Sequence, residues 1–116
     1  MSAIDDKWAQ LPWLGNPKDE GAGAQEGPMP DGRGRTRDYD NGTIYWTPQT
    51  GAHEVHGAIR DLWQAQGWER GPAGYPLSDE FNDPSAPGGR QSHFQRGVIA
   101  WDQHRGARFS AGVPID

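Results

Sequence analysis

The chain has 116 residues, of which 33% are hydrophobic, while 17 are glycine and 10 are proline. A domain of this size has one modest core, and the six tryptophans supply apolar surface that can hold so glycine-rich a fold together. The net charge of −5, the lack of cysteine and the shortness of every apolar run argue against nucleic acid as a partner, against disulfide or zinc–thiolate sites, and against insertion into a membrane.

The same residue pattern occurs twice along the chain. Three tryptophans recur after 55 positions, in the pairs Trp8 and Trp63, Trp13 and Trp68, and Trp46 and Trp101. Self-similarity of this kind indicates one supersecondary unit used twice. We therefore predict a single domain over residues 1–116 that consists of repeat one at 1–57, repeat two at 58–112 and a short tail at 113–116.

Each repeat is predicted to open with a short helix. The apolar stripes at helical spacing are Ile4, Trp8 and Leu11 in repeat one and Ile59, Leu62 and Trp63 in repeat two. Ser2 and Asp5 resemble a capping box at the first helix, and Gly67 is placed to end the second one. Helices of two or three turns are marginal alone, so we expect both to depend on packing.

A glycine-proline turn, a polar loop and a small antiparallel β meander follow each helix. We place the loops at 21–37 and 82–91, without regular structure. The predicted strands lie at 39, 43–46 and 52–56 in repeat one and at 93–94, 98–101 and 107–110 in repeat two. Asn41-Gly42 is a strong hairpin signal because glycine tolerates a positive φ.

These elements predict an α+β fold. Repeat units rarely bury their faces alone, so we expect the two repeats to pack on each other with pseudo-twofold symmetry or to complete a ring by self-association as a homo-oligomer. Trp8, Trp46, Trp63 and Trp101 are expected to lie in the core.

Three segments of each repeat carry a distinctive combination of residues. They are Leu14–Glu20, Gly42–Trp46 and Thr50–Gly57 in repeat one, and Ile59–Trp63, Ala73–Glu80 and Phe94–Trp101 in repeat two. Together they resemble the LGFP repeat, which occurs in tandem in actinobacterial cell-envelope proteins. The resemblance extends over nearly the whole chain.

The resemblance implies a non-catalytic module without a cofactor that binds cell-wall glycan, of arabinogalactan or peptidoglycan type. Relatives carry such repeats beside mycolyl-transferring or wall-cleaving enzymes. A partly exposed aromatic ring offers a flat face to sugar C–H bonds, and polar neighbours orient the hydroxyls. The residues expected to contact the ligand are Tyr45, Trp68, Tyr75, Asp79, Glu80 and Arg108.

Two other functions stay open. The arginine-rich loop at 21–37 favours a structural or protein-interaction scaffold in a secreted or phage-borne assembly. The acidic pairs ending in Glu20 and Glu80 allow a small glycan hydrolase. Adjacent acids in a turn diverge and more often accept backbone N–H groups, which disfavours the hydrolase.

Two further features bear on metal binding and export. His53 and His56 have an H-x-x-H spacing, but residues three apart on a strand point to opposite faces, so we expect no metal site. Residues 1–7 contain two acids and no apolar run, so we expect no signal peptide in this sequence. The compartment therefore stays open.

Overall fold

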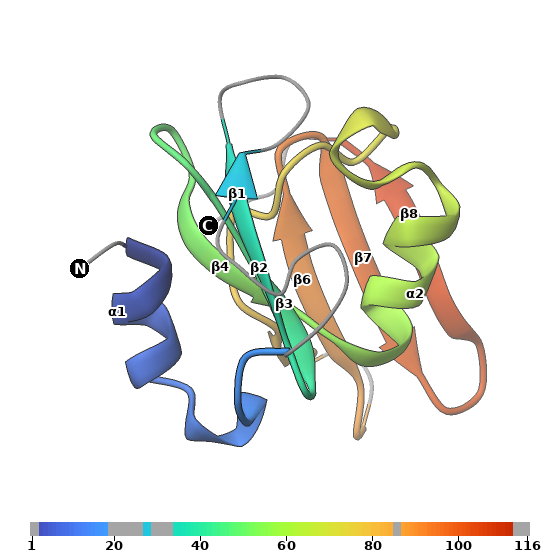
Figure 1. The fold of residues 1–116 in the computed structure, drawn as a ribbon. Coiled ribbons are helices and arrows are strands. Elements are labelled where there is room, and N and C mark those ends of the chain that lie inside the picture. Colours follow the sequence, from blue (N-terminus) through green and yellow to red (C-terminus); the bar gives the residue numbers. More distant parts are fainter. Residues whose placement is uncertain (1–2, 19–26, 29–33, 85–86, 113–116) are drawn as a thin grey trace.

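A computed structural model describes residues 3–18, 27–28, 34–84 and 87–112 of the chain (Figure 1). The elements of repeat one are α1 (Ala3–Ala9), the short 3-10 helix η1 (Pro12–Leu14), β1 (Gly27–Pro28), β2 (Arg35–Tyr39), β3 (Gly42–Thr47) and β4 (Gly51–Val55). Those of repeat two are α2 (Gly57–Ala65), η2 (Trp68–Arg70), β5 (Phe81–Asn82), β6 (Arg90–Phe94), β7 (Gly97–Asp102) and β8 (Gly106–Ala111). The α+β class and the two tandem repeats are confirmed.

Each repeat contains one antiparallel sheet of four strands, in which neighbours follow chain order. The registers are equivalent, since Ile44 pairs with Glu54 and Ile99 pairs with Phe109. A single bridge also joins the glycine-proline turn to the second strand of each sheet, through Pro17 and Tyr39 or through Pro76 and Phe94. The 55-residue period of the sequence therefore corresponds to a repeated strand register.

A tryptophan on each helix fixes the turn that follows it. The Trp8 indole N–H donates to the Gly15 carbonyl over 2.8 Å, and the Trp63 indole N–H donates to the Gly74 carbonyl over 3.0 Å. Both glycines have φ of 80°. The turn of repeat two is the longer one, and the extra residues are accommodated between the helix and this common hydrogen bond.

The two repeats share a core. A small cluster in repeat one contains Ile4, Leu14, Tyr39 and Ile44. The larger cluster joins Tyr45 and Val55 of repeat one to Ile59, Trp63, Ala73, Tyr75, Phe94 and Ile99 of repeat two. The Tyr45 ring meets the Trp63 ring edge-on, with centroids 4.7 Å apart and planes at 89°. Packing of the repeats on each other is thus confirmed, whereas pseudo-twofold symmetry and self-association stay predictions.

Repeat two presents a different surface at the strand positions that correspond to this contact. The counterparts of Tyr45 and Val55, 55 residues later, are Ala100 and Ser110. Ser110 is exposed, and Ala100 is only partly buried. The aromatic contact between repeats therefore belongs to the sheet of repeat one alone.

The structure corrects the predicted loops. Strand β2 begins at Arg35 and β6 begins at Arg90, and the short strands β1 and β5 lie at 27–28 and 81–82. These segments show no apolar alternation, so pairing determines their strand character: β2 and β6 pair with β3 and β7, and β1 and β5 pair with β2 and β6. The loop residues 19–26 and 29–33, the cap residue Ser2 and the tail 113–116 lie outside the described residues.

The expected roles of several hydrophobic and turn residues also change. Trp63 is fully buried, but Trp8, Trp46 and Trp101 are only partly buried against the two clusters. Gly42 is absent from the described residues with positive φ, contrary to the hairpin argument. It is needed instead for close approach, because a Cβ there would lie 2.9 Å from the Leu14 side chain.

Candidate functional site

The acidic pair Asp79-Glu80 lies at the junction of the repeats, against the edge strand β4. The Asp79 carboxylate accepts from the Glu54 backbone N–H over 3.1 Å and from Lys7 Nζ on α1 over 2.9 Å. His53 Nδ1 lies 3.3 Å from the same carboxylate. Asp79, which lies just before β5 of repeat two, therefore contacts both α1 and β4 of repeat one.

Next to Asp79, a chain of charged side chains crosses the junction. The Glu54 carboxylate, only 1% of whose residue surface is exposed, accepts from the Glu80 backbone N–H over 2.8 Å and lies 2.6 Å from His56 Nδ1. His56 Nε2 lies 3.4 Å from the Glu80 carboxylate, to which Arg90 Nε donates over 2.7 Å. The alternating signs offset the cost of burying these charges.

The contacts at the junction shift two pKa values. The Glu54 hydrogen bond raises the pKa of His56 against the opposing effect of burial, and the Glu54 and Glu80 charges raise it further. Burial alone would raise the pKa of Asp79, but hydrogen bonds from His53, Lys7 and the Glu54 backbone lower it to about 2. A protonated His56 and an ionised Asp79 are the forms that stabilise the junction.

Replacing Asp79 with asparagine tests this contact through the pH dependence of stability. Because the pKa falls from 3.8 to about 2 on folding, ionised Asp79 stabilises the fold above pH 4, and this contribution is lost as pH falls toward 2. We expect Asp79→Asn to lower the free energy of unfolding by about 1–2 kcal/mol at pH 7, allowing for partial exposure, and by almost nothing near pH 2. Urea unfolding at both pH values measures the difference. The exposed carboxylate of Asp6 is the control, and an Asp6→Asn profile that matched Asp79→Asn would contradict the assignment.

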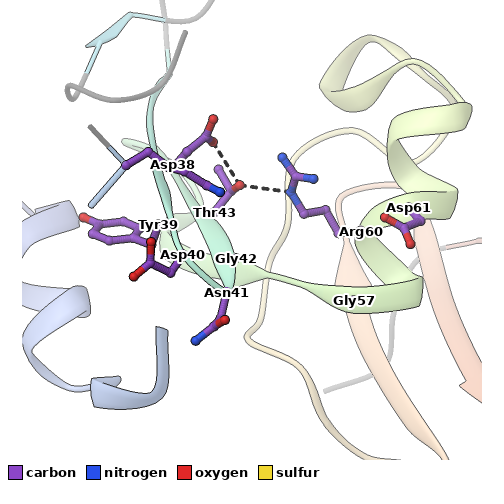
Figure 2. Close-up of a pocket in the computed structure, with 10 residues that line it drawn as sticks. Asp38, Tyr39, Asp40, Asn41, Gly42, Thr43, Gly57, Arg60 and Asp61 are labelled. Carbon is purple, nitrogen blue, oxygen red and sulfur yellow. Dashed lines mark hydrogen bonds between the residues drawn. The ribbon is translucent and has the colours of Figure 1, made fainter. Parts of the chain in front are cut away.

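A polar hollow of about 330 Å³ opens on one side of the junction (Figure 2). Arg60 reaches from α2 toward β3, where its Nε donates to Thr43 Oγ1 over 3.0 Å and Thr43 in turn donates to Asp38 over 3.0 Å. The other charged or amide side chains around this hollow are Lys18, Asp40, Asn41 and Asp61. Such a lining presents donors and acceptors in several directions.

A second hollow, of about 250 Å³, adjoins the first at Gly57. Its apolar surface comes from Ala58, Ile59 and the Trp101 ring, and its polar wall comes from His56, Glu80 and Arg90. Gly57 has φ of 59°, which turns the chain sharply from β4 into α2. Gly57 thus lines both hollows at the point where the chain turns.

An exposed tryptophan lies beside both hollows. Trp13 is 44% exposed, and its ring lies 4.6 Å from the His56 ring, centroid to centroid. Its backbone carbonyl accepts from Asn41 Nδ2 over 2.7 Å. Trp13 thus contacts one lining residue of each hollow, and we call the two hollows together with Trp13 the junction strip.

The structure brings two of the six expected ligand contacts to the junction. Glu80 lines the apolar hollow and Asp79 adjoins it. Tyr45 and Tyr75 were expected to be partly exposed, but they are core residues with exposures of 5% and 4%, and burial raises the pKa of the Tyr45 phenol. Their rings therefore pack against protein and offer no open face.

Trp68 and Arg108 lie elsewhere. Trp68 is partly buried against Trp63, and the Arg60 guanidinium covers its ring at 5.1 Å from the centroid. Arg108 pairs with Asp102 over 2.9 Å within its own hairpin. The backbone N–H of Arg105 is the first of several hydrogen bonds that lower the pKa of Asp102 to about 2. Arg108 therefore stabilises a turn.

Most residues of the strip were not predicted from the sequence. Trp13 was predicted only as a member of the repeat pattern, and His56 only as part of an H-x-x-H spacing for which no metal site was expected. In the described part of the chain, no group of three or more histidine, aspartate or glutamate side chains is arranged to hold a metal ion. A signal for the charged junction beside the strip was the change of residue type between repeats, because Glu54 aligns with Phe109.

The chain belongs to the LGFP repeat family, whose model matches residues 22–71 and 74–115. These segments are phased differently from the repeats at 1–57 and 58–112, as a tandem array can be divided at any point of its period. A comparison with curated proteins gives no match. None of the described helices has the length and apolar character needed to cross a membrane.

Proposed function

We propose that this protein is a non-catalytic binding module for cell-envelope polysaccharide, of arabinogalactan or peptidoglycan type, and that the junction strip is its binding surface. The observation that carries the proposal is Trp13, an exposed aromatic residue whose ring contacts His56 of the apolar hollow and whose backbone carbonyl accepts from Asn41 of the polar hollow. Membership of the LGFP repeat family supports it. Two adjoining hollows suit successive residues of one polymer chain.

The chemistry of the strip fits an uncharged, hydroxyl-rich ligand. Planar polar groups such as Arg60, Asn41 and Asp61 bind hydroxyls through paired donors and acceptors. The Trp13 ring supplies an apolar face for sugar C–H bonds. The carboxylates and cations that line the strip nearly balance, so neither strongly anionic nor strongly cationic polymers are favoured.

Co-sedimentation with insoluble actinobacterial cell walls tests the function. We expect the protein to be retained and soluble wall glycan, either arabinan or galactan or peptidoglycan fragments, to release it. Trp13→Ala is expected to weaken retention about tenfold, which corresponds to about 1.4 kcal/mol. Phe81→Ala is the control, since Phe81 is 37% exposed and lies outside the strip, and it should bind like the unaltered protein.

The same experiment separates the alternatives. Failure to bind any wall fraction, together with recovery of one defined protein complex, would favour the scaffold function. Glycan turnover that disappears in Glu80→Gln would favour the hydrolase. Equal losses in Trp13→Ala and Phe81→Ala would remove the strip as the binding surface.

A further inference from the structure

The apolar hollow of the strip has an unusual combination of surfaces for a sugar site. Its floor is aliphatic and aromatic, from Ala58, Ile59 and Trp101, and one wall carries Glu80 and Arg90. Hydroxyls gain nothing from an aliphatic floor, because burying a hydroxyl without a partner is unfavourable. The hollow therefore fits a group that is apolar at one end and polar at the other.

The polar wall has both an acceptor and donors to offer. Arg90 Nε and His56 Nε2 engage Oε2 of Glu80, at 2.7 and 3.4 Å, while Oε1 of Glu80 has no hydrogen bond within the described chain. Arg90 has five N–H donors, and its contacts with Glu80 and Asn82 use three of them. One carboxylate oxygen and two guanidinium N–H donors are thus left for a ligand.

An acetamido group matches this wall and floor. Its methyl group suits the aliphatic floor, its N–H suits the Glu80 carboxylate oxygen, and its carbonyl suits the Arg90 guanidinium. A simple hydroxyl in its place would fill less of the hollow and leave the floor without a contact. A carboxylate would be repelled by Glu80 and by the buried Glu54 behind His56.

We propose that the apolar hollow at the junction of the repeats selects a sugar with an N-acetyl group, the acetamido group entering between Ala58, Trp101, Glu80 and Arg90. The proposal rests on the proposed function and deepens it, since it names the class of sugar that the strip prefers. The polar hollow then holds the hydroxyls of a neighbouring sugar in the same chain.

Two matched oligosaccharides test the selection. Oligomers of N-acetylglucosamine and of glucose with the same β-1,4 linkage and length differ only in the substituent at C2. Calorimetric titration of the full chain is expected to give about tenfold tighter binding for the N-acetylated oligomer. Saturation-transfer NMR is expected to show its acetyl methyl protons as the most strongly saturated.

Filling the hollow provides the decisive variant. Ala58 is exposed at the first turn of α2, and Ala3 is its counterpart on α1, 55 residues earlier. Ala58→Phe is expected to abolish the preference between the two oligomers, while Ala3→Phe keeps it. Ala58→Leu repeats the test with a smaller side chain, and circular dichroism checks that each variant is folded.

The possible results separate the two proposals. Equal binding of both oligomers, or an undiminished preference in folded Ala58→Phe and Ala58→Leu, would overturn the acetamido site. If neither oligomer binds but cell walls are retained and released by arabinan or galactan, the acetamido site fails and the proposed function stands. If neither the walls nor the oligomers bind, both fail.

Discussion

Replacing Trp63 with alanine is expected to lower the free energy of unfolding by about 3–5 kcal/mol, as for other large aromatic residues lost from a core. Trp63 is fully buried, and its ring contacts Tyr45, Trp68 and Phe94. Its indole N–H also fixes the turn at Gly74. A domain of this size has a stability of roughly 5–15 kcal/mol, so this loss removes a large share of it and the variant is expected to unfold at a much lower urea concentration than the unaltered protein.

The counterpart Trp8 provides the matched control. It makes the equivalent hydrogen bond to a turn glycine and stacks on Tyr39, but it is only partly buried. Trp8→Ala should therefore cost less than half as much as Trp63→Ala. Urea unfolding followed by circular dichroism measures both variants. Equal losses would mean that the contact with Tyr45 adds little to the role of Trp63.

The second large effect is expected at Glu54. Glu54→Ala should lower the free energy of unfolding by about 3 kcal/mol, because it leaves the Glu80 backbone N–H and Nδ1 of His56 at the junction without their acceptor. Glu80 belongs to repeat two, and His56 lies at the boundary between the repeats. We therefore expect the variant to lose the cooperative unfolding of the two repeats and to show a separate, earlier transition.

Glu54→Gln separates charge from hydrogen bonding. The amide oxygen can still accept from the Glu80 backbone N–H, so we expect a loss of only about 1–2 kcal/mol. The charge that raises the pKa of His56 is removed, so its imidazole should titrate at lower pH by NMR. An unchanged His56 titration, or a single unaltered unfolding transition in Glu54→Ala, would contradict the role assigned to this carboxylate.

The repeat period predicted the architecture because it reflects backbone register. Trp8 and Trp63 donate to equivalent glycine carbonyls in their turns, and the central strands β3 and β7 follow the predicted spacing. Only the ends of β2 and β6 were predicted, since Arg35 and Arg90 begin polar segments whose pairing is decided by the neighbouring strand, and the short strands β1 and β5 were missed. Local propensity does not contain that information.

The site was less predictable than the fold. Aromatic type alone does not tell a core ring from a binding surface, and Tyr75 is buried while Trp13 is exposed. Glu80 was identified because it lies in the repeated turn, but its partners His56 and Arg90 come from other elements and were brought to it by packing. Side-chain clusters between repeats depend on how the two repeats pack against each other, and the 55-residue period of the sequence does not specify that packing.

The replacement of Tyr45 by Ala100 gives the tandem pair a direction. A chain in which the two repeats were permuted would place Ala100 opposite Trp8 of α1, where Tyr45 now meets Trp63, and would leave that ring partly hydrated. The modules are therefore not interchangeable building blocks, although they have one backbone plan. A longer array built from these repeats therefore needs an aromatic residue at the Tyr45 position of each sheet, where it can pack against the tryptophan of the helix that follows.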